Sequence, residues 1–161
     1  MPQIQFANST SVREQILANI KTTLESISIA NGYHNDVQRV LRYKIAAWQT
    51  IIFPTLMVVG VHVDKKAIEG GPSRMNATLY GAVMCCLNVD PVEDTETLHD
   101  LLTLDVEKAL QVDVRRGGIA RDTTIVGDDL QVVEAELPFA VSTLTFEVMF
   151  TYDRQDPTFP R

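Results

Sequence analysis

Hydrophobic positions recur every three or four residues in the segment Ser11–Ala30. Ser11 and Glu14 have the spacing of a capping box, in which the hydroxyl and the carboxylate each accept a free backbone N–H of the first helical turn. Asn31-Gly32 is typical of a helix end, because both residues tolerate a left-handed backbone. We therefore predict a helix from Ser11 to Ala30. Its apolar stripe contains Val12, Ile16, Leu17, Ile20, Leu24 and Ile27.

A second amphipathic pattern predicts a helix over Thr95–Asp113. Asp94 or Thr95 can cap its start, where acidic side chains also suit the positive end of the helix dipole. Arg115–Gly118 has the composition of a turn that follows this helix. The apolar face of the helix contains Leu98, Leu101, Leu102, Leu104, Val106, Ala109 and Leu110.

The remaining patterned segments are β-like. Asp64–Arg74, with two glycines and a proline, has loop composition, and we predict that it projects as a hairpin arm. Asp128-Asp129 is expected to form a hairpin turn. In the last segment the even-numbered residues from Ser142 to Tyr152 are the more apolar set and should face the core. The predicted strands are Asp36–Tyr43, Thr55–Val63, Met75–Val89, Thr123–Val126, Leu130–Glu136 and Ala140–Asp153.

The order of these elements, αβββαβββ, predicts an α+β fold. Two main helices packed on one mainly antiparallel sheet is the simplest arrangement for that order. We expect a single domain over residues 1–161, with the arm at 64–74 and an extended C-terminal tail at 154–161.

Charge and hydropathy narrow the function classes. The net charge is −7, which opposes broad contact with nucleic acid because phosphate would be repelled. No segment has the ~20 apolar residues of a membrane span, and Met1–Thr10 lacks a signal-peptide pattern. We therefore expect a protein that is made in a cytoplasm and contacts no membrane.

Candidate chemistry is sparse. His34, His62 and His99 do not have the spacing of metal ligands, and no phosphate-binding glycine loop or nucleophile elbow occurs. Cys85 and Cys86 are adjacent in a predicted strand, so their side chains should point to opposite faces as small apolar groups. We predict no catalytic, cofactor-binding or metal-binding residues, and hence no enzyme.

Several local features in order resemble one known family. After the first helix come Gly32-Tyr33, then Val37–Val40 with Arg42, and then Trp48 before Phe53–Leu56. The second helix contains Asp105–Leu110, and the last strand ends in Tyr152–Pro157. This series resembles the tail terminator, or tail completion, proteins of long-tailed bacteriophages over roughly Ser11 to Pro157. Asp64–Arg74 and Ile119–Glu136 have no counterpart in that resemblance.

The resemblance implies a virion structural protein. Proteins of this family form a ring, expected to be a hexamer, that seats on the last ring of tail tube protein and stops its polymerisation. The other face of the ring meets a head completion or neck protein, and DNA passes through the lumen without specific binding. A repeated acidic chain around such a pore would repel DNA. The expected location is the tail or neck of the virion, after assembly in the host cytoplasm.

A closed ring requires two different patches on each subunit. We predict that one patch is basic and that the acidic start of the second helix is a complementary one. The candidate interface residues are Arg39, Arg42, Lys65, Lys66, Arg74, Arg115, Arg116, Asp153 and Arg154.

Two alternatives remain open at the level of sequence. A head-tail connector or neck protein of the same particle would share the ring and the lack of chemistry. A small oligomeric enzyme with a site between subunits would be of a different class, and it would need His34, Asp36 and Arg39 to act together, in a loop where functional residues often lie.

Overall fold

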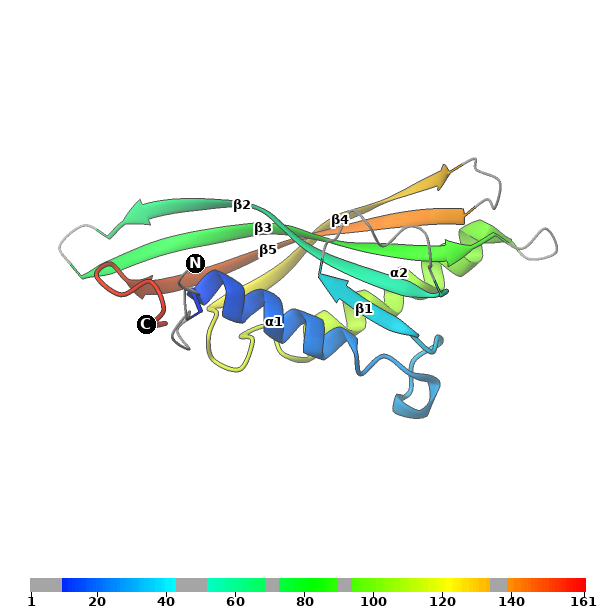
Figure 1. Ribbon diagram of the computed structural model, residues 1–161, viewed down its shortest axis with the longest axis horizontal. Coiled ribbons are helices and arrows are strands. Elements are labelled where there is room, and N and C mark those ends of the chain that lie inside the picture. Colours follow the sequence, from blue (N-terminus) through cyan, green and yellow to red (C-terminus); the bar gives the residue numbers. More distant parts are fainter. Residues whose placement is uncertain (1–9, 43–51, 69–72, 90–93, 134–138) are drawn as a thin grey trace, which may run out of the picture.

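The computed structural model is a single α+β domain with two helices and a five-stranded mixed sheet (Figure 1). It describes residues 10–42, 52–68, 73–89, 94–133 and 139–161. The strands lie in the order β1-β2-β3-β5-β4, with β1 parallel to β2 and the other neighbours antiparallel. The elements are α1 (Val12–Leu24), a 3₁₀ turn (Ile29–Asn31), β1 (Arg39–Arg42), β2 (Thr55–Ala67), β3 (Arg74–Asn88), α2 (Thr95–Val112), β4 (Asp122–Val133) and β5 (Phe139–Asp153).

The first helix, α1, begins as predicted but ends earlier. Ser11 Oγ accepts the backbone N–H of Glu14 at 3.2 Å, which is one half of the predicted capping box. The Glu14 carboxylate instead accepts Arg42 Nη1 at 2.7 Å. The helix ends at Leu24, and the following Ser26 hydroxyl donates to a carbonyl oxygen of the last turn. The predicted stop at Gly32, φ 82°, closes the 3₁₀ turn and not the helix.

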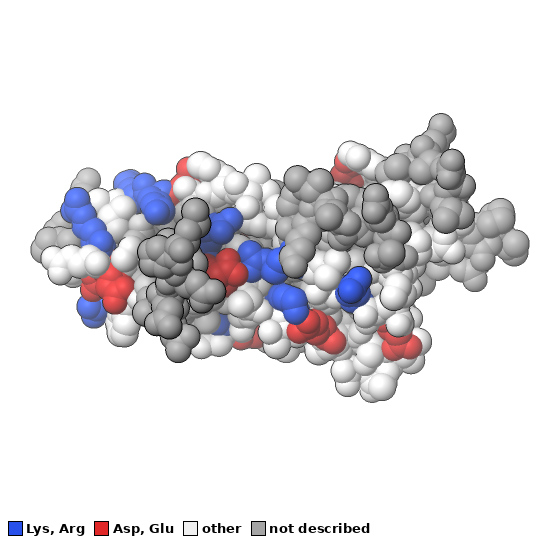
Figure 2. Space-filling model, viewed as in Figure 1, with Lys and Arg blue, Asp and Glu red and all other residues white. Residues whose placement is uncertain are grey.

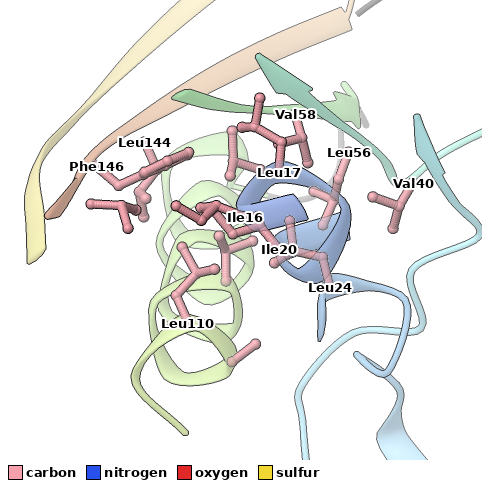
Figure 3. Close-up of a cluster of buried hydrophobic side chains, with 14 of the residues drawn as sticks. Ile16, Leu17, Ile20, Leu24, Val40, Leu56, Val58, Leu110, Leu144 and Phe146 are labelled. Carbon is pink, nitrogen blue, oxygen red and sulfur yellow. The ribbon is translucent and has the colours of Figure 1, made fainter. Parts of the chain in front are cut away.

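Both helices cover the same face of the sheet, and the core lies between the two layers (Figure 3). Ile16 and Ile20 of α1 point toward the strands, and Leu110 of α2 lies beside them. On β5 the even-numbered residues from Ser142 to Tyr152 are all buried, as predicted from the alternation of apolar and polar side chains. Burial of this apolar surface is the main force that holds helices and sheet together.

The second helix, α2, has nearly the predicted bounds, but Leu104 of its predicted apolar face is exposed. Asp94 is the N-cap, and its carboxylate accepts the backbone N–H of Glu96 at 3.0 Å. The turn after the helix is also confirmed, with left-handed backbone at Arg116, Gly117 and Gly118. No helix of the described residues has the length and apolarity needed to cross a membrane.

Part of the predicted arm is strand and not loop. β2 continues through Asp64, Lys65 and Lys66 to Ala67, and β3 begins at Arg74. The two strands reach past the start of α1 (Figure 1), and on β2 the consecutive side chains of residues 64–67 are exposed on both faces. Charged residues are therefore tolerated in the strand. We call residues 61–68 and 73–80 the arm.

The C-terminal third contains two strands where three were predicted. β4 runs without interruption through Asp128-Asp129, so the predicted hairpin turn at this pair is wrong. The pairing of β4 with β5 changes register between Ile125 and Gly127, and β4 continues past this irregularity as one strand. β4 is at the edge of the sheet, where its aspartates can reach solvent. The order of the described elements is thus αβββαββ, and Trp48 lies outside the described residues.

Candidate functional site

Most of the predicted interface residues gather at the end of the arm. Lys65 and Lys66 are exposed near the end of β2, and Arg74 is exposed at the start of β3. Arg74 pairs in register with Asp153, and the backbone N–H of Arg154 donates to Ser73 O at 2.8 Å. The sheet thereby brings together residues that are about eighty positions apart in sequence. Figure 2 shows Lys and Arg side chains gathered at this end, with a few acidic ones among them.

The C-terminal tail, residues 154–161, folds back onto the domain and so differs from the predicted free extension. Tyr152 and Pro160 form a β-bridge, and Arg161 Nη2 lies 2.6 Å from Asp153 Oδ2. That hydrogen bond from Arg161 is the main reason why the pKa of Asp153 is lowered. Pro157 O accepts the backbone N–H of Val12 at 3.0 Å, which satisfies a free donor of the first turn of α1. The tail therefore connects the arm to the start of α1.

A pocket of about 340 Å³ lies where the arm, the tail and the start of α1 meet. Phe150 and Tyr152 of β5 contribute aromatic surface, and Arg13 and Lys65 contribute positive charge. Lys65 Nζ lies 5.7 Å from the centre of the Tyr152 ring, within the range of a cation–π contact. The helix-facing side of the arm is thus partly apolar with a basic rim.

The two predicted interface residues of β1 lie elsewhere in the fold. Arg39 is exposed on this edge strand, whereas Arg42 is partly buried and forms an ion pair with Glu14 of α1. Arg42 therefore serves to attach β1 to α1. The structure does not bring β1 into the group of residues at the arm end.

Arg115 and Arg116 are neighbours in the turn after α2, but they differ in exposure. Arg115 is exposed, but Arg116 is completely buried. The Arg116 guanidinium donates to Thr123 Oγ1 at 3.0 Å and to the carbonyl oxygen of Leu110, and burial lowers its pKa. Arg116 therefore cannot offer its charge to a partner, which corrects its assignment to the interface. Its role is to fix the end of α2 against β4.

His99 is the other polar residue whose environment differs from expectation. Its place on an amphipathic helix suggests a solvated or amphipathic position, but only 5% of His99 is exposed. It hydrogen-bonds with the hydroxyl of Ser142 through Nδ1 and with Asp128 through Nε2, at 3.1 Å from the carboxylate. Serine, histidine and aspartate form the relay of many hydrolases. Here the Ser142 hydroxyl is fully enclosed beneath α2, so the group ties α2 to β4 and β5.

The residues required by the enzyme alternative do not contact one another. His34 hydrogen-bonds with Asp105 of α2, and Asp36 accepts the backbone N–H of Ile29 at 2.8 Å. Arg39 is exposed on β1. Within the described ranges, no three His, Cys, Asp or Glu side chains are placed to hold a metal ion.

Sequence reasoning missed two participants at the arm end and one at the opposite edge. Arg161 and the half-exposed Phe159 lie in the predicted extended tail, and the Arg161 guanidinium is 5.2 Å from the centre of the Phe159 ring. Asp129 was assigned to a turn, but it lies exposed in the edge strand β4. No protein-family model matches this chain, and no curated protein matches it either.

Proposed function

We propose that this chain is a bacteriophage tail terminator, a virion structural protein that forms a ring on the end of the tail tube. The sequence features that resemble this family span most of the chain, and the α+β domain provides the frame for them. The ring would stop tube polymerisation and present its other face to a head completion or neck protein.

The observation that carries this proposal is the arm. Its strands reach beyond the helices, and it gathers Lys65, Lys66, Arg74 and Arg154 at one end of an otherwise acidic chain. A partner would find charged side chains and extended backbone there, held rigidly by the pairing of β2, β3 and β5. Ala77 and Leu79 of the arm belong to the core, but β2 from Asp64 to Ala67 is exposed, and this end of the arm is therefore free to contact other proteins.

The net charge of −7 fits a ring around DNA. A lumen lined by an acidic protein repels phosphate and lets the duplex pass without sticking. The basic residues of the arm would then lie at subunit or tube contacts, away from the lumen.

The direct test is electron microscopy of tail tube protein from the same phage, polymerised with and without this chain. We expect short tubes of uniform length that have a ring at one end when the chain is present. Tubes that grow to the same lengths in both samples, with no ring bound, would overturn the terminator function. Binding of a ring to the portal side of the neck in that case would favour the connector alternative.

A pair of charge reversals makes the test specific to the arm. Arg154→Glu changes an exposed residue at the arm end, and Lys21→Glu makes the same change of charge on α1. We expect Arg154→Glu to reduce capping and Lys21→Glu to preserve it. Equal capping by both variants would remove Arg154 from the contact surface.

A further inference from the structure

Both edges of the sheet have backbone that no described strand covers. β1 pairs with β2 only along Thr55–Val58, and the Gly60 carbonyl oxygen accepts Arg13 Nη2 at 2.9 Å. Beyond this point, the outer edge of β2 from Val61 to Ala67 faces no strand among the described residues. Among the described strands, β4 pairs only with β5, from Asp122 to Val133. An uncovered strand edge presents unpaired N–H and C=O groups that can pair with another strand.

The two edges differ in charge. The uncovered part of β2 contains Lys65 and Lys66, and its one acidic residue, Asp64, already lies 2.9 Å from His62 Nε2. β4 contains Asp122, Asp128 and Asp129 and has no Lys or Arg. Opposite charges on facing strands attract, whereas two β4 edges would set aspartate against aspartate. Contact between β2 and β4 is therefore favoured over contact between two copies of the same edge.

The directions of the strands permit this contact. β2, β3, β5 and β4 alternate in direction, because each is antiparallel to its neighbour. A second copy in the same orientation would therefore bring its β2 antiparallel to β4 of the first copy. The pairing would extend the sheet from one copy into the next without a break in its pattern.

The faces of the side chains also agree. Lys66 of β2 pairs in register with Asn76 of β3, which in turn pairs with Thr151 of β5. Asp129 of β4 pairs with Thr143 of β5. Thr151 and Thr143 are eight residues apart on one strand, so they and their partners share the face away from the helices. By the same reasoning, the helix-side face contains Lys65 and Asp128. If Lys66 is opposite Asp129, Lys65 and Asp128 become diagonal neighbours, within reach of a long side chain.

We propose that the uncovered edge of β2 in one copy pairs with β4 of the next copy and so joins the subunits head to tail. This inference rests on the proposed ring and names the surface through which its subunits meet. The two contact surfaces differ, so each copy has one of each and the assembly can extend until it closes. A contact of this kind builds a ring or a filament, and not a two-fold dimer.

Disulfide trapping tests the pairing. We would combine Lys66→Cys with Asp129→Cys, because directly opposed residues on paired strands have the Cα spacing that a disulfide needs. Cys85 and Cys86 are buried and should not take part. Under mild oxidation the double variant should give a ladder of dimer, trimer and larger species on a non-reducing gel. Each single variant should remain monomeric, because neither edge pairs with itself.

Three outcomes would overturn the inference. Dimers from Lys66→Cys alone would show that two β2 edges pair with each other. The control pair, Lys21→Cys with Glu107→Cys, places the cysteines on the two helices. A ladder of equal yield from this pair would show that random collision alone links the copies. No ladder from the edge pair, in the free protein and on tail tubes alike, would show that the subunits join elsewhere.

A charge exchange gives an independent measurement. Lys66→Asp and Asp129→Lys should each weaken self-association about tenfold, and the double variant should recover most of the loss. Sedimentation of each variant at several concentrations measures this, with Glu107→Lys as the control. No recovery in the double variant would contradict direct pairing. If rings cap the tubes but the Lys66→Cys, Asp129→Cys variant gives no disulfide-linked ladder, this inference alone is refuted. If the ladder forms but the tubes are not capped, only the terminator function is refuted.

Discussion

The carboxylate of Asp105 accepts the backbone N–H of His34 at 2.9 Å and that of Asn35 at the same distance. Asp105 is on α2 and is completely buried, whereas His34 is in the loop before β1. Burial alone would raise the pKa of Asp105, but hydrogen bonds from His34 and Asn35 outweigh it and lower the pKa below the ordinary value of a carboxyl group. The Asp105 carboxylate thus attaches the loop before β1 to α2.

Replacement of Asp105 by asparagine should weaken the fold in a way that depends on pH. We expect a loss of about 2 kcal/mol in the free energy of unfolding at pH 7, because charge-assisted hydrogen bonds are replaced by weaker ones. The folded-state pKa is lowered, so the contribution of Asp105 is fully present above about pH 4 and is lost as the pH falls through the lowered pKa.

Urea unfolding of both proteins at pH 7 and at pH 3 measures this effect. The difference should shrink at the lower pH, because at pH 3 the Asp105 carboxylate is largely protonated in the unfolded protein, whose pKa is the ordinary value of 3.8, whereas its pKa in the folded protein is lower. A difference that is equal at the two values would mean that the charge of Asp105 does not contribute to stability.

Arg116 and Arg115 should respond in opposite ways to charge reversal. Arg116→Glu would place an unpaired carboxylate in a site that now encloses a hydrogen-bonded guanidinium, so we expect a loss of about 3 kcal/mol or more. Arg115→Glu, at an exposed position, should change stability by about 0.5 kcal/mol or less. Thermal unfolding monitored by circular dichroism compares the two, and equal melting temperatures would contradict the structural role of Arg116.

The difference in burial between Arg115 and Arg116 could not be predicted from the sequence. Both precede Gly117-Gly118 and have the pattern of a surface turn, and the turn itself is present. What buries Arg116 is the position of Thr123, on a strand whose place beside α2 is set by the whole fold. Local signals, such as the Asp94 cap and the apolar stripe of α1, were predictable because they depend on neighbours in sequence.

The same distinction explains the errors in β4 and at His99. Asp128-Asp129 resembles a turn when only the local sequence is considered, because aspartate favours turns. In the fold, Asp128 meets His99 from a helix about thirty residues away, and this contact helps to keep the pair in the strand. The arm was recognised as a projection, but its grouping with Asp153 and Arg154 required the pairing of β3 with β5.

Gly81 should be intolerant of a side chain. A Cβ atom at this position of β3 would lie 2.4 Å from Phe146 Cζ and 2.9 Å from the carbonyl oxygen of Val59. Phe146 is a fully buried core residue, so the ring or the strand would have to move. We expect Gly81→Ala to cost about 1 to 3 kcal/mol in urea unfolding.

The control for Gly81 is Gly127 of β4. A Cβ there meets no atom within 4 Å, so Gly127→Ala should change stability by about 0.5 kcal/mol or less. A comparable loss from both variants would indicate that glycine matters for strand backbone in general, and not for the packing of Phe146.

The two cysteines should be inert while the protein is folded. Cys85 and Cys86 point to opposite faces of β3, and both are completely buried. Burial raises the pKa of Cys86 to about 11 and raises that of Cys85 as well. Because the thiolate is the reactive form, only roughly one Cys86 in a thousand would be ionised at pH 8. Ellman's reagent should therefore label neither residue until the fold opens.

Labelling kinetics in native buffer and in urea test this prediction, with Lys66→Cys as a control. The added thiol is on the exposed arm and should react at once, whereas the native pair should react at a rate that follows unfolding. Because the two thiols face different sides of the sheet, loss of packing on one face alone would release one of them first. Two separate phases would therefore mean that the faces open independently, and a single phase that β3 is exposed only when the whole sheet unfolds.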